Sequence, residues 1–147
     1  MKHLLPALLL VVTTSLGSHA SFADGAVLNA NTATAEELAN IPNMDEDLVG
    51  AIVNNRPFAT IGELDELLGA DLSDDELQAL YTHLFVPIKL NSADKSEILL
   101  IPGIGDRMAH EFEEYRPYSN IEQFRMEIGK YVDEKEVARL EQYVTMD

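Results

Sequence analysis

The sequence contains no cysteine, so disulfide bonds and a cysteine-linked lipid anchor are both excluded. Basic residues are scarce as well. Ten Lys and Arg stand against 26 Asp and Glu, which leaves a formal net charge of −16. Proteins bind duplex DNA largely through Lys and Arg contacts to phosphate, so this charge opposes nucleic-acid binding. The apolar content, 46%, is ample for a folded core, and stability must come from packing.

No apolar run is long enough to span a bilayer, because the longest one extends only from Leu4 to Val12 and contains Pro6. A short basic start precedes it, and two small-x-small cleavage signals follow, one ending at Ala23 and the other at Ala20. We therefore expect residues 1–23 to be a signal peptide, cleaved after Ala23 or Ala20, and the mature protein to be periplasmic or secreted without a membrane anchor. A short N-terminal anchor is the alternative.

Patterns that would carry catalysis or metal binding are missing. The sequence has no Ser-His-Asp arrangement, P-loop or deaminase signature, so we expect neither an enzyme nor a cofactor. The acidic runs at 45–47 and 71–76 lack the alternating oxygen ligands and central glycine of a calcium loop. His83 and His110 have no partner at metal-ligand spacing, so no metal site is expected and both are interpreted as surface residues.

The segment from Leu100 to Ala109 reads as the end of one helix, a turn and the start of another. Pro102 cannot continue a helix, and Gly103 and Gly105 permit positive φ and close backbone approach. Ile104 between them is expected to turn inward and fix the turn to the core. Such a turn leaves backbone N–H groups at a helix N-terminus, where anions bind favourably. A tight connector without a ligand is the alternative.

A shift of 60 residues overlays the chain on itself without a gap. The matches are turn and cap positions: Asn31 with Asn91, Pro42 with Pro102, Arg56-Pro57-Phe58 with Arg116-Pro117-Tyr118, Gly69 with Gly129, and Glu76 with Glu136. The repeat predicts two copies of one unit, residues 24–87 and residues 88–147.

Capping signals divide each copy into four short helices, in which a small polar residue precedes Glu or Gln by three positions. The first copy has Thr34/Glu37, Thr60/Glu63 and Ser73/Glu76, and the second has Asp94/Glu97, Asn120/Gln123 (or Ser119/Glu122) and Asp133/Glu136. Apolar spacing extends the last helix of each copy to Leu84 and to Val144. No segment has a convincing strand pattern, so an all-α fold is expected.

These residues resemble the ComEA family of exported DNA-uptake receptors. The likeness is carried by Leu28 to Leu38, Ile-Pro, Arg-Pro-Phe and Ile-Gly-Glu-Leu in the first copy, and by Leu90 to Ala93, Ile104-Gly105 and Arg116-Pro117-Tyr118 in the second. The resemblance implies two tandem double helix-hairpin-helix units and binding of duplex DNA. A more distant resemblance is to PsbU, an acidic exported photosystem subunit whose helix-hairpin-helix units bind no DNA.

The copies differ where the resemblance implies chemistry. Only 103–105 keeps Gly-Ile-Gly; Asn43-Met44-Asp45 stands at the equivalent site, and the second hairpins are reduced to Gly69-Ala70-Asp71-Leu72 and Gly129-Lys130-Tyr131-Val132. Residues 24–87 hold 1 basic and 13 acidic residues, hence 1 − 13 = −12, whereas residues 88–147 hold 8 and 13, hence 8 − 13 = −5. A phosphate ligand is therefore expected on the second copy.

Two functions remain open at this stage. One is non-specific binding of duplex DNA, for which the candidate phosphate-binding residues are Gly103, Ile104, Gly105, Arg107, Lys95 and Lys130. The other is docking of a basic protein partner on the acidic residues 24–87. The remaining repeated positions are expected to be structural: Pro42, Pro102, Arg56, Pro57, Arg116 and Pro117.

Overall fold

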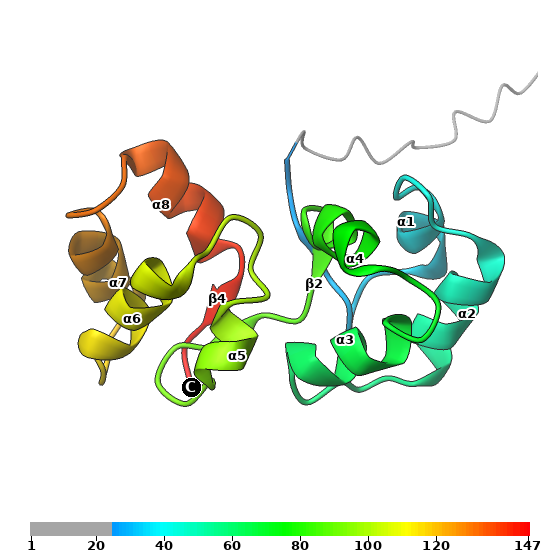
Figure 1. Ribbon diagram of the computed structural model, residues 1–147, viewed down its shortest axis with the longest axis horizontal. Helices are drawn as coiled ribbons and strands as arrows, with labels where there is room; N and C mark the ends of the chain where they lie inside the picture. Colours follow the sequence, from blue (N-terminus) through cyan, green and yellow to red (C-terminus); the bar gives the residue numbers. More distant parts are fainter. Residues whose placement is uncertain (1–24) are drawn as a thin grey trace, which may run out of the picture.

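A computed structural model describes residues 25–147, so the expected signal peptide lies outside the described residues. Within them the same series of elements occurs twice (Figure 1). The first series is β1 (Leu28–Asn29), α1 (Ala35–Ala39), α2 (Glu46–Asn54), α3 (Ile61–Leu68), α4 (Asp74–Tyr81) and β2 (Leu84–Phe85). The second is β3 (Ile88–Lys89), α5 (Lys95–Ile98), α6 (Asp106–Glu114), α7 (Ile121–Ile128), α8 (Glu134–Glu141) and β4 (Val144–Thr145). The expected mainly helical fold, with four short helices per copy, is confirmed.

Most of the expected caps begin their helices as predicted. At α1 the Glu37 N–H donates to the Thr34 hydroxyl over 3.1 Å, and the Thr34 N–H donates back to the Glu37 carboxylate over 2.7 Å. Ser73 and Glu76 make the same reciprocal pair at α4. Each such cap satisfies amides that a helix start leaves without partners and contributes about 1 kcal/mol.

One cap prediction needs correction, and one that left two possibilities is decided. Thr60 precedes α3 but its side chain makes no capping bond, because Glu63 instead accepts a hydrogen bond from the Ala59 N–H at 2.6 Å. Of the two possibilities before α7, the structure has Asn120, whose side chain accepts from the Gln123 N–H at 2.9 Å.

The expectation of no strands is wrong in detail. β1 pairs in parallel with β2, and β3 pairs in parallel with β4. Leu84 and Val144 therefore lie in strands, and the helices before them end at Tyr81 and Glu141. The ends of each unit meet in this way because the Leu28 N–H donates to the His83 carbonyl, just as the Ile88 N–H donates to the Tyr143 carbonyl. Strands of two residues have no period that a sequence pattern can reveal.

The two repeated arginines, for which a structural role is expected, fix the corner between the second and third helices of each copy. Arg56 donates to the carbonyls of Ala30 and Ala33 at 2.5 and 2.6 Å. Arg116 donates to the equivalent carbonyls of Leu90 and Ala93 at 2.6 and 2.8 Å. Cis peptide bonds follow both arginines, at Pro57 and Pro117. An aromatic residue follows each of these prolines. The backbone of Phe58 makes two hydrogen bonds with the side chain of Asn31, and the backbone of Tyr118 makes the same two with Asn91.

The two units share one continuous hydrophobic core. Tyr143 of the second unit is buried against Phe85 of the first, with ring centroids 4.9 Å apart and the rings edge to face. Its hydroxyl donates to the Tyr81 carbonyl at 2.9 Å. The chain passes directly from β2 to β3 between the two groups of helices (Figure 1). Within residues 25–147, no helix has the length and apolar character needed to cross a membrane.

Candidate functional site

The Gly-Ile-Gly turn joins α5 to α6 by a tight backbone reversal. The Ile104 N–H donates to the Ile101 carbonyl at 3.1 Å, and Gly103 adopts a positive φ of 81° that favours glycine. Ile104 packs against the core, as expected. Because its N–H is used within the turn, Ile104 has no amide to offer a ligand, which corrects the expectation that all three residues of 103–105 contribute one.

The start of α6 is open to an anion. Gly105 stands at its N-cap with φ −106°, an ordinary extended conformation, and supplies no capping side chain. Asp106 lies in the first turn. Within the described part of the chain, the amides of Asp106, Arg107 and Met108 have no hydrogen-bond acceptor. Amides in this position, together with the helix dipole, favour negative charge.

The equivalent start of α2 is closed. Asp45 occupies the N-cap, and its carboxylate accepts a hydrogen bond from the Leu48 N–H at 2.9 Å. Asn43 has a positive φ of 62°, and Gly103 at the equivalent position of the second unit has a positive φ of 81°. The turn at 43–45 thus keeps its shape, while a carboxylate of the protein itself occupies the helix start.

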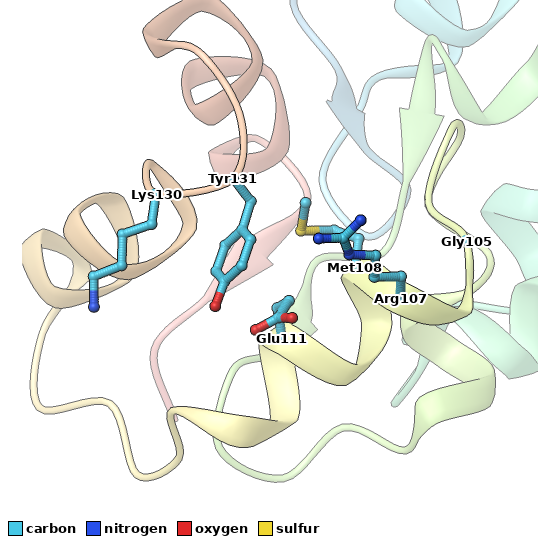
Figure 2. A pocket seen from close by; sticks show the side chains of 6 residues that line it. All are labelled: Gly105, Arg107, Met108, Glu111, Lys130 and Tyr131. Atoms are coloured by element: carbon cyan, nitrogen blue, oxygen red, sulfur yellow. The ribbon is translucent and has the colours of Figure 1, made fainter.

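A pocket of about 410 Å³ lies between α6 and the loop after α7 (Figure 2). It brings together three of the predicted site residues, Gly105, Arg107 and Lys130. Sequence reasoning missed Met108, Glu111 and Tyr131. For the first two, the only signal was that Met108 and Glu111 stand three residues apart on one helix and therefore share a face. Tyr131 stood out in the sequence only as part of the reduced hairpin at 129–132, and its place beside α6 depends on the tertiary structure.

Some of the predicted cations are already paired with carboxylates of the protein, and one is not. Lys95 pairs with Asp106 at 2.9 Å, and Lys130 pairs with Glu127 and lies 5.0 Å from the ring centre of Tyr115. In Figure 2 the Lys130 side chain points away from Arg107, with Tyr131 between them in this view. Arg107 is exposed and has no carboxylate partner within residues 25–147. It is therefore the predicted cation best placed to meet a new anion.

Tyr131 is held in place by a hydrogen bond of 2.7 Å between its hydroxyl and that of Tyr115. This bond, together with Glu111, raises the pKa of Tyr131 well above its ordinary value. The tyrosine is therefore neutral at physiological pH, and its hydroxyl can donate or accept a hydrogen bond but brings no charge to the pocket. Glu111 supplies a negative charge on the same wall, so Arg107 faces a pocket of mixed polarity.

A further cation beside the hairpin, Arg139, was not among the predicted site residues. Its guanidinium lies 3.4 Å from the position that a Cβ would take on Gly103. It is committed to Glu136, which accepts two hydrogen bonds from it at 2.8 and 2.7 Å and whose pKa falls below its ordinary value as a result. The sequence offered one signal of this ion pair, because Glu136 and Arg139 stand three residues apart on one helix.

The other candidates are structural or absent. Pro42 and Pro102 lie in the equivalent turns, and Arg56 and Arg116 are used in the corners. Among the described residues, no group of three or more His, Asp or Glu side chains is arranged to hold a metal ion. His110 does have a neighbour at i, i+4 that the sequence reading overlooked, since its Nε2 lies 3.8 Å from the Glu114 carboxylate on the exposed face of α6.

Comparison of the chain with protein-family models, with curated proteins and with solved structures gives no match.

Proposed function

We propose that the chain is a non-catalytic, exported module that binds the sugar-phosphate backbone of duplex DNA without reading its sequence. The observation that carries this proposal is the uncapped start of α6, where amides without acceptors lie next to the unpaired Arg107. Backbone amides at a helix start favour an anion, and an arginine can add charge-assisted hydrogen bonds to the same phosphate. Lys95 and Lys130 border the site as cations already paired with carboxylates.

The resemblance to ComEA-type hairpins supports the same ligand, but the net charge of −16 opposes it. Few free cations also mean that few counterions are released from the DNA. We therefore expect weak binding with a shallow salt dependence, a log–log slope of about −1 to −2, corresponding to one or two phosphates.

Fluorescence anisotropy of a labelled duplex, titrated with the full chain at about 50 and 200 mM salt, tests the proposal. Arg107→Ala should weaken binding and reduce the magnitude of the salt slope by about one. Gly105→Asp should abolish binding, because it places a carboxylate where Asp45 stands in the first unit. Met126→Asp, at a side chain that is 62% exposed on α7, adds the same charge away from the hairpin and should have little effect.

The proposal fails if the chain does not bind duplex at low salt, or if Gly105→Asp and Met126→Asp weaken binding equally. Absence of binding would favour a second candidate, an acidic protein-interaction module. One observation supports that candidate directly. Five of the eight cations of residues 88–147 are already engaged by carboxylates or carbonyls, namely Lys95, Arg116, Arg125, Lys130 and Arg139.

A further inference from the structure

The first unit has a small pocket between its first hairpin and α4, with a volume of about 270 Å³. Apolar side chains of the hairpin, α2 and α4 line it, and its polar groups come from Asn43, Asp75, Glu76 and His83. Ala79 lines it as well and, with only a methyl group, leaves it unfilled. Small-molecule sites usually measure about 300 Å³ or more, so the pocket suits a single side chain better than a free ligand.

The second unit shows which side chain occupies the position equivalent to this pocket. The shift of 60 residues puts Arg139 of the second unit over Ala79. Arg139 contacts three neighbours: it donates twice to Glu136, lies beside Gly103, and stands 5.8 Å from the ring centre of Tyr143. The same shift puts these three neighbours over Glu76, Asn43 and His83. All three equivalents line the pocket of the first unit.

The charges around the pocket favour a cation. Hydrogen bonds from Ser73 to one carboxylate oxygen hold the pKa of Glu76 below its ordinary value, so the group is ionised at neutral pH. Its other oxygen accepts no hydrogen bond from the described residues, whereas both oxygens of Glu136 are occupied by Arg139. Asp75 also lines the pocket, at the position where the second unit has Lys135. The cation that balances these groups in the second unit is therefore missing in the first.

We propose that this pocket receives an arginine side chain from a basic protein segment, with the guanidinium on Glu76 and the aliphatic stem against the apolar wall. A second copy of the chain is a poor source of that arginine, because two chains of net charge −16 repel each other. This site lies on the first unit and uses none of the residues of the DNA proposal, so either proposal can fail without the other.

The test uses the ¹⁵N-labelled full chain and the capped peptide acetyl-Lys-Leu-Arg-Leu-Lys-amide. Saturable shifts of amide resonances should concentrate at Asn43, Glu76 and His83. Replacing the arginine of the peptide by citrulline, which has the same shape without the charge, should weaken binding at least tenfold. Equal binding of the two peptides, or shifts spread evenly over the acidic surface, would overturn the proposal.

Ala79→Arg copies the second unit and should fill the pocket from within, reducing peptide affinity at least tenfold while the amide spectrum stays dispersed. Gln78→Arg adds the same charge at the neighbouring position, which does not line the pocket, and should keep the affinity within about threefold. If Ala79→Arg binds the peptide as the unmodified chain does, the proposal is wrong. Should that variant fail to fold, Glu76→Gln decides instead, since it must lose at least tenfold in affinity if the guanidinium docks there.

Discussion

At the start of α2 the carboxylate of Asp45 covers the helix N-terminus, whereas at the equivalent start of α6 Gly105 leaves the amides uncovered. The opposite holds in the groove between the first hairpin and the last helix of each unit, where the second unit has its own charged side chain and the first unit has none. Arg139 fills it in the second unit, and Ala79 leaves it open in the first. Each unit thus supplies from its own chain a charge that the other unit lacks at the equivalent position. The charges of −12 and −5 agree with this division, because the cation site that we propose lies on the more acidic copy.

What the two units have in common is their framework. The arginine corners, the asparagine bonds and the strand pairs recur with nearly the same geometry. The two copies therefore share the interactions that form the fold and differ in the side chains that face solvent at these two sites. The predictions below probe first the shared framework and then the differences.

The largest effect is expected at the corners. Arg56→Ala and Arg116→Ala each remove two charged hydrogen bonds and leave two carbonyls without these donors, so each should reduce the free energy of unfolding by about 3 kcal/mol. Arg→Lys at either position should recover only part of this loss, because lysine lacks the forked donor. Chemical denaturation measures both. Losses that differ widely between the two sites would show that the corners are not equivalent.

Replacement by Ala should destabilise the fold at Gly69 and Gly129, which follow α3 and α7, but not at Gly105 of the hairpin. A Cβ on Gly129 would lie 2.7 Å from the Arg125 carbonyl oxygen, and one on Gly69 would lie 2.9 Å from that of Asp65. Replacement of either by Ala should reduce the free energy of unfolding by about 1–3 kcal/mol, since backbone must move. A Cβ on Gly105 meets nothing within 4 Å, so Gly105→Ala should be nearly neutral in the same thermal or chemical melts.

Substitutions can remove the side-chain cap from the start of α2 and add one to the start of α6. Asp45→Ala removes a side-chain cap and should cost about 1 kcal/mol. Gly105→Asp should instead stabilise the fold by a few tenths of a kcal/mol, because the backbone at Gly105 has a negative φ and incurs no strain. The variant should therefore melt slightly higher and yet lose DNA binding. A variant that loses both stability and binding would show that an unfavourable fold, rather than the carboxylate, causes the loss.

The smallest effect concerns pH. Two hydrogen bonds from Arg125 lower the pKa of Glu141 from its ordinary value of 4.5. A pKa lowered by folding contributes stability above the ordinary value, and that contribution disappears as the pH falls through the lowered value. Glu141→Gln should therefore melt slightly below the unmodified chain near about pH 7, and this difference should shrink as the pH falls below 4.5 and through the lowered pKa. A difference that persists in acid would assign the effect to packing instead of to charge.

The sequence alone determined the repeat, the helices and most of their starts. Those features depend on local chemistry: prolines and glycines end helices, and polar caps satisfy amides three residues away. The corner role of Arg56 and Arg116 was also predictable, because each stands before a proline at the same place in both copies. The open turn at 103–105 belongs here too, although its ligand remains a proposal.

Tertiary structure decided what distant segments do to one another. The parallel strand pairs join residues 56 apart in each unit, and the helix pattern continued falsely into Leu84 and Val144 because apolar spacing cannot distinguish a buried strand from one more helical turn. Only the folded chain shows that Tyr131 lines the pocket beside Arg107. It also shows that Arg139 occupies a groove of the second unit whose equivalent in the first unit, beside Ala79, is open. A side chain's charge can be read from the sequence, but whether that charge is free depends on which carboxylate the fold brings to it.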